Sequence, residues 1–467
     1  MMDLTRAKFE RTNCKAFRKY VGRTSVRTLN LKPFRYVSLL YKKCLVVKNN
    51  ADKNWAISPL SILLAMVMVL HGTSGKTRKE IRQALGIVAK IEYISNIQPK
   101  KSDAVVDKDD EENLDIDALL SRFKLSQLAV KTAGKLYLNE RYKICDDYKE
   151  NVKSLDVSDL TEAARMINLE VSKATDEKIG DIISSGDMSK NSVSLLVSAF
   201  YFQQKFLEAF NPKHSIKASF HGCSEDITFM HKTGMIDHCN FHESYYQLKA
   251  KGVRLELEKD MFLVIVIPNN KDGLKQINEQ LKEPRDELFL KCMLEKKKYT
   301  KKQLDFYVPK FKLDGHFEVT KILEAMGIEE AFSKKADFRK ISNSKIRLGS
   351  VHHKAVMLVN ESGVKTAPEP SCQSTRCQLK ADHPFLVAVV TNNDIPILLG
   401  NVWEPNYPDS TEPVDPSSIG NSGESVLMTK EYECNENLSV YMDFGHDEED
   451  SDDEETSQDI AISREFS

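Results

Sequence analysis

Two short stretches carry residue types that do chemistry in proteins. Gly75-Lys76-Thr77 resembles the end of a phosphate-binding loop, but such a loop also needs a glycine five positions earlier, where Leu70 stands. A nucleotide site is therefore not expected, and the glycine indicates a turn between helices. His352 and His353 are adjacent. Adjacent strand residues point to opposite faces, so this pair is not expected to share a metal ion.

Cysteine and serine patterns also give no catalytic or metal site. The nine cysteines are irregularly spaced, with no C-x-x-C pair and no Cys/His spacing typical of zinc. The chain has no G-x-S-x-G nucleophile motif. We therefore expect mostly reduced thiols, no cofactor and no metal.

Charge divides the chain into three parts. Residues 1–50 hold 13 Lys/Arg against 2 Asp/Glu, and residues 406–467 hold 2 against 18. The part between them holds 52 against 49, so it lacks the basic field that nucleic-acid binding needs. The run DEEDSDDEE over 447–455 is expected to be a solvated acidic tail, with an interaction segment as the alternative.

The sequence predicts neither a signal peptide nor a membrane-spanning helix. Asp3, Arg6 and Lys8 leave the N-terminus without the apolar core of a signal peptide. The longest apolar run, over 57–70, is too short to span a bilayer and indicates a buried helix. As written, the chain suggests a cytoplasmic protein with no membrane partner.

The order of the predicted elements is helices first and strands later. Spacing and breakers predict helices over 31–47, 57–70, 76–85, 114–131, 273–281 and 319–326, with an exposed loop over 97–113. Strands are predicted over 135–138, 193–202, 246–248, 252–257, 262–267, 304–308, 356–359, 386–390 and 397–399. Because βαβ alternation is absent, the fold class is α+β.

A set of motifs lies in a fixed order along the middle of the chain. They are NWAISPLSI (54–62), GTSGKT (72–77), SAFYFQQKF (198–206), VPKFK (308–312), ADF (336–338), DHPF (382–385) and LGNV (399–402). Together they resemble the serpin family of serine protease inhibitors. Ser198 replaces that family's usual Asn, and Phe206 replaces its usual Trp.

The resemblance implies one serpin domain over 31–406, preceded by a flexible basic leader (1–30) and followed by a disordered acidic tail (407–467). It implies the serpin fold: three β-sheets, about nine helices and an exposed reactive loop. Inhibitory members act as suicide substrates: a serine protease cuts the loop, which then inserts into the large sheet as a new strand. The resemblance thus implies a protein that is not an enzyme, with a serine protease as its expected partner and a monomer as its expected state. The family is often extracellular, so the compartment stays open.

The hinge of the loop departs from the inhibitory pattern. Glu361 and Gly363 fit the family. Inhibitory members then usually have Thr or Ser, followed by Glu and a run of alanines, whereas this chain reads Val364, Lys365, Thr366, Ala367, Pro368, Glu369, Pro370. Proline has no N–H for a sheet ladder, so Pro368 and Pro370 are expected to hinder insertion.

The loop is also about four residues shorter than is usual in the family. Counting the family's spacing forward from Glu361 puts the cleaved bond after Cys377, whereas counting back from Pro384 puts it near Gln373. Arg376 lies between them and suits a trypsin-like pocket, so the predicted reactive bond is Arg376–Cys377. Cys372 and Cys377 lie in the same loop, within reach of an oxidative cross-link. Two functions follow: a serine protease inhibitor, or a non-inhibitory serpin with a binding, carrier or chaperone role.

Overall fold

The computed structural model describes residues 25–31, 33–47, 52–93, 130–149, 151–243, 248–282, 286–365 and 377–407. The loop predicted over 97–113 and nearly all of the helix predicted over 114–131 lie outside these ranges, and so do Thr366, Pro368, Pro370, Cys372 and Arg376.

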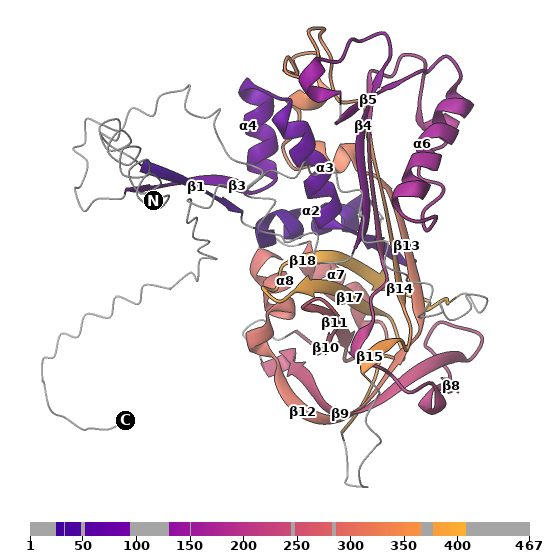
Figure 1. The fold of residues 1–467 in the computed structure, drawn as a ribbon. Helices are drawn as coiled ribbons and strands as arrows, with labels where there is room; N and C mark the ends of the chain where they lie inside the picture. The colour runs from indigo at the N-terminus through magenta and orange to yellow at the C-terminus, as the bar shows by residue number, and fades with distance from the viewer. Residues whose placement is uncertain are drawn as a thin grey trace, which may run out of the picture.

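A five-stranded sheet forms one layer of the molecule (Figure 1). Its order is β13 (Phe311–Glu318), β14 (Ser350–Val359), β6 (Ser194–Phe202), β4 (Lys131–Asn139) and β5 (Val152–Leu155). All nine residues of β6 are buried, which confirms the prediction of a strand covered on both faces. One face packs on α6 (Leu160–Ala174) through Ile167 and Val171, and the other lies against α3 (Pro59–His71).

A nine-stranded sheet carries the second layer. Its order is β16 (Cys377–Lys380), β12 (Thr300–Pro309), β9 (Ile227–Asn240), β10 (Ala250–Glu256), β11 (Met261–Pro268), β17 (Phe385–Thr391), β18 (Pro396–Val402) and β2 (Trp55–Ile57), with β8 (Ile216–Ala218) also on β9. The 14-residue strand β9 pairs with β12 and β8 along most of its length and with β10 at its end. Strand β9 thereby joins into one continuous sheet the two smaller sheets that the serpin resemblance implies.

The remaining elements lie outside these two sheets. The helices are α2 (Pro33–Val47), α4 (Gly75–Ala84), α7 (Gly273–Leu281), α8 (Asp286–Leu294) and α9 (Thr320–Ala325). Two-stranded pairs join β1 (Ser25–Leu31) to β3 (Ile87–Tyr93) and β15 (Gly363–Lys365) to β7 (Phe206–Glu208). Single 3-10 turns are η4 (Asp146–Tyr148), η5 (Ser185–Asp187), η6 (Pro212–His214), η7 (Phe241–Glu243), η8 (Lys296–Lys298) and η9 (Glu330–Phe332).

Helix α3 begins at Pro59, two residues later than predicted, because Ile57 belongs to strand β2. The hydroxyl of Ser58 accepts the backbone N–H of Ser61, which caps the helix, and Pro59 occupies the first turn, where its missing N–H costs nothing. Gly72 ends the helix, and a Cβ built there would lie 2.3 Å from the Ile341 side chain. The glycine therefore permits a close approach of two chain segments.

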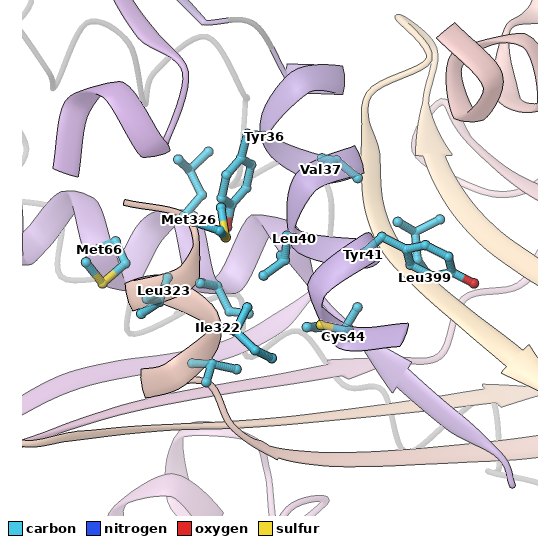
Figure 2. Packing of buried hydrophobic residues seen from close by; sticks show 14 of the residues in the cluster. Tyr36, Val37, Leu40, Tyr41, Cys44, Met66, Ile322, Leu323, Met326 and Leu399 are labelled. Atoms are coloured by element: carbon cyan, nitrogen blue, oxygen red, sulfur yellow. The ribbon is translucent and has the colours of Figure 1, made fainter. Parts of the chain in front are cut away.

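The core is continuous between the helices and the nine-stranded sheet. Figure 2 shows Leu40 and Tyr36 of α2 facing Leu323 of α9 and Met326, which directly follows that helix, while Tyr41 lies beside Leu399 of β18. The Tyr41 hydroxyl donates to the Asn401 side-chain oxygen at 2.8 Å, so this buried polar group is satisfied. These contacts hold the N-terminal helix on the sheet.

The α+β class is confirmed. Seven α-helices fall within the described residues, close to the nine or so implied by the resemblance. Across that same part of the chain, no helix has the length and apolarity needed to cross a bilayer.

Candidate functional site

The loop leaves the five-stranded sheet after β14 and enters the nine-stranded sheet at β16. Strand β14 ends at Val359, the hinge runs through Glu361 and Gly363 into β15, and the chain re-enters at Cys377 in β16. Strand β16 is paired in parallel with β12, from Leu304↔Cys377 to Tyr307↔Lys380. Each end of the loop is thus held by a sheet.

The strands next to the hinge form a seam in the five-stranded sheet. We define the seam as the parallel pairing of β14 with β6, which runs without interruption from Ser350↔Leu195 to Met357↔Phe202. Every other pair in this sheet except β4–β5 is antiparallel. A strand that entered from the hinge would turn back between β14 and β6 and pair antiparallel with both.

Glu361 anchors the hinge at the end of the seam. Its Oε1 lies 2.6 Å from Lys310 Nζ and accepts the Ser215 hydroxyl at 3.1 Å. Its side chain is 12% exposed and that of Lys310 is 26% exposed, so the pair is only partly solvated. The backbone carbonyl of Glu361 accepts the N–H of Phe210 at 3.1 Å.

Beyond Glu361 the hinge continues in the direction of β14. Gly363 and Lys365 pair in parallel with Phe206 and Glu208 of β7. A Cβ built on Gly363 would lie 2.3 Å from the Ala209 backbone, so only glycine fits here while the pair is formed. Val364 is 52% exposed and uncovered by the core. A strand formed from the hinge could enter the seam only if the β15–β7 pair opened first.

A buried polar cluster lies midway along the seam. The imidazole of His353 in β14 accepts the Ser58 N–H on Nε2 at 3.0 Å, and its Nδ1 lies 3.2 Å from the Ser198 hydroxyl of β6. Ser198 Oγ in turn lies 2.5 Å from Ser61 Oγ. Because Nε2 accepts, the proton sits on Nδ1 and bridges the two strands that a new strand would separate.

Burial fixes the charge of this cluster. Loss of hydration on burial lowers the pKa of His353 to about 3, so the imidazole is neutral at physiological pH. Burial likewise lowers the pKa of His352, which faces away from His353 toward His316 at 6.3 Å between ring centroids. No cluster of metal-binding side chains occurs among the described residues. The opposite orientation of the two histidines agrees with the sequence argument.

The two departures from the family motif have different consequences. Ser198, in place of Asn, still bonds to His353. Phe206, in place of Trp, packs edge-on against Phe210 at 5.0 Å, and its N–H donates to the Ser362 carbonyl at 2.9 Å. Phe206 thus contacts the hinge directly, whereas Ser198 acts midway along the seam.

Several contacts at this end of the sheet were not predicted from the sequence. Lys310 lies in the VPKFK motif, but nothing local marks it as the partner of Glu361. The Asn360 side chain donates to the Tyr407 hydroxyl at 3.0 Å, so the described chain ends beside the hinge. Cys377 is exposed and unbonded, while its predicted partner Cys372 lies outside the described residues.

The comparisons with known proteins fit this geometry. The family model described as serpin (serine protease inhibitor) matches residues 38–405. Human serpin B3 is 27% identical over 372 residues, covering 75% of this chain and 93% of its own length. Rat alpha-1-antiproteinase is 28% identical over 397 residues, covering 80% of this chain and 88% of its own. The chain belongs to the serpin family.

Solved structures show the same fold. Uncleaved ovalbumin matches with a TM-score of 0.66 at 21% identity, covering 80% of this chain and 98% of its own. Thyroxine-binding globulin in complex with thyroxine matches with a TM-score of 0.65 at 22% identity, with the same coverage. Most members of the serpin family are protease inhibitors.

Proposed function

We propose that this serpin inhibits a serine protease as a suicide substrate, with Pro368 and Pro370 slowing the insertion step. The observation that carries the proposal is the seam. It is a parallel strand pair with no strand inserted, and the hinge that leads to the loop starts at its end.

The steps follow from this arrangement. The protease serine attacks the carbonyl of Arg376 and forms an acyl-enzyme, releasing the amine of Cys377 as the new N-terminus. The cut loop is then free to turn at Glu361 and enter the seam. It replaces one parallel ladder with two antiparallel ladders, so the sheet gains roughly one ladder of hydrogen bonds. Insertion carries the acylated protease along, provided that insertion is faster than hydrolysis of the acyl bond.

The prolines affect one side of the inserted strand more than the other. In a central antiparallel strand, residues i and i+2 direct their N–H groups to the same neighbour. Pro368 and Pro370 are two apart, so both missing donors fall on one ladder and the opposite ladder stays complete. Each lost bond forfeits about 0.5–1.5 kcal/mol, with a steric cost besides. Insertion is thus hindered without being blocked.

Arg376 directs the choice of target protease. A trypsin-like pocket accepts arginine, and no other residue of the region 371–377 suits it. The target is therefore a trypsin-like serine protease, and the serpin acts as a monomer.

A non-inhibitory role is the second candidate, and the two prolines are the observation that favours it. The solved thyroxine-binding globulin, which holds thyroxine, indicates that the same fold also serves ligand binding. In this case the loop would be cut as an ordinary substrate.

Incubation with trypsin separates the two functions. The inhibitor proposal predicts a minor SDS-resistant complex beside a larger amount of loop-cleaved serpin, and no complex with trypsin whose serine is blocked. The variant Pro368→Ala/Pro370→Ala should raise the share of complex. Complete cleavage after Arg376 with no complex in either protein would favour the non-inhibitory role.

A further inference from the structure

A dense cationic surface lies at the start of β12, away from the hinge. Five of the seven residues over 296–302 are exposed lysines, which we call the lysine patch: Lys296, Lys297, Lys298, Lys301 and Lys302. Figure 1 shows α8 and β12, which flank this segment, on the side of the molecule opposite β15. The patch contrasts with the near neutrality of residues 51–405 as a whole.

The backbone under the patch is fixed. Tyr299, between the lysines, is buried, and its hydroxyl donates to the Met293 carbonyl. Its ring meets Phe241 edge-on at 6.0 Å, and a Cβ on Gly252 would lie 2.6 Å from its hydroxyl. Strand pairing of Thr300 with His238 continues the anchor. The cations are therefore presented on a rigid support, which lowers the ordering cost of binding.

Neighbouring carboxylates neutralise only part of the patch. Lys297 pairs with Glu295 at 2.9 Å, and Lys301 pairs with Asp237 at 3.5 Å. Asp394 is occupied by the guanidinium of Arg254 at 2.6 Å and by the backbone N–H of Lys296. Within the described ranges, the ammonium groups of Lys296, Lys298 and Lys302 have no carboxylate partner.

The same chain supplies an anion that fits. The run over 447–455 holds eight carboxylates in nine residues, and residues 408–467 carry 18 acidic against 2 basic side chains. From Tyr407, 40 residues lead to Asp447. A random-coil chain of 40 residues would have a root-mean-square span of about 35 Å, against a radius of gyration of about 21 Å for a domain of this size. The acidic run can thus reach the patch at a local concentration on the order of millimolar.

We propose that the acidic run 447–455 docks on the lysine patch of its own molecule. The association is electrostatic and reversible, so it weakens as salt shortens the screening length. It leaves the patch closed to other polyanions at low ionic strength and open when the tail is engaged elsewhere or removed.

Carbodiimide cross-linking of the full chain tests the proposal, since it joins carboxylates to lysines only in direct contact. At low ionic strength, the monomer should yield cross-links from 447–455 to Lys296, Lys298 or Lys302. At about 1 M salt their yield should fall at least about fivefold. Cross-links found only in dimers, or mainly to leader lysines such as Lys8 and Lys15, would overturn the proposal.

A matched pair of variants gives the second readout. Lys296→Gln/Lys298→Gln/Lys302→Gln removes the unpaired cations. The control changes three exposed lysines elsewhere, by the substitutions Lys334→Gln, Lys335→Gln and Lys345→Gln.

On a heparin column, truncation after Tyr407 should raise the salt needed for elution in wild type and control. In the patch variant this increase should be lost. Equal retention of full-length and truncated wild type, or an increase that persists in the patch variant, would overturn the docking.

Discussion

Reversal of the charge at Glu361 should destabilise the hinge more than any other single surface change at this end of the sheet. Glu361→Lys removes a 2.6 Å ion pair with Lys310 and the bond from Ser215, and places two ammonium groups together. Hydrogen bonds to charged groups contribute about 1.5–3 kcal/mol. Like charges about 4 Å apart repel by up to about 4 kcal/mol at an effective dielectric of 20.

Partial exposure reduces both effects, because the lysines can turn toward water. We therefore expect a loss of about 2–4 kcal/mol in the free energy of unfolding for Glu361→Lys. Glu361→Gln should lose about 1–2 kcal/mol, since an amide can still accept from Ser215. The swapped pair Glu361→Lys/Lys310→Glu should recover most of the Coulomb contribution.

Denaturant unfolding of the three variants and wild type measures these differences, and limited proteolysis of the hinge reports the opening of β15 from β7. The reasoning is refuted by a Glu361→Lys protein as stable as wild type. A charge swap that recovers nothing would show that the residue acts through its backbone and not through Lys310.

Further predictions concern pH, the seam, the tail and the loop. The folded pKa of His353, about 3, lies below its unfolded value, so the unfolded chain binds a proton first as the pH is lowered. The free energy of unfolding should therefore decrease by about 2 kcal/mol from pH 7 to pH 5. His353→Gln should remove this pH dependence in unfolding measurements. Ser198→Ala removes the side-chain bond across the seam and should lower unfolding free energy by about 1 kcal/mol in denaturant melts. Truncation after Tyr407 should leave the melting temperature within about 2 °C, and a larger drop would show that the tail stabilises the fold. Trypsin should cut after Arg376 before other sites in 51–405, and early fragments identified by mass spectrometry decide this.

Local patterns in the sequence were enough to predict many elements. Gly273–Leu281 is helical over the predicted residues, and β6 is as fully buried as its unbroken apolar run indicates. Helix α6 was missed although its buried positions, Ala163, Ala164, Ile167 and Val171, recur at helical spacing, because two of the four are alanines and give a weak apolar signal. Their burial depends on a sheet that forms from distant segments.

The site was less predictable for the same reason. Glu361 and Gly363 were identified through family motifs, whereas Lys310, Ser215 and Tyr407 reach the hinge only through sheet pairing far along the chain. His353 gave no local sign of its role, because its partners Ser58 and Ser198 are about 295 and 155 residues away. Contacts of such separation require the tertiary fold.

The melting temperature before and after cleavage at Arg376 tests the central claim most directly, that the cut loop enters the seam and that its prolines slow the entry. In wild type, slow insertion should leave much of the sheet five-stranded and give only a small rise. Lys365→Glu/Pro368→Ala/Pro370→Ala should give a rise of tens of degrees, because the new strand completes both ladders. A large rise already in wild type would contradict the proline barrier, and no rise in either protein would contradict insertion itself.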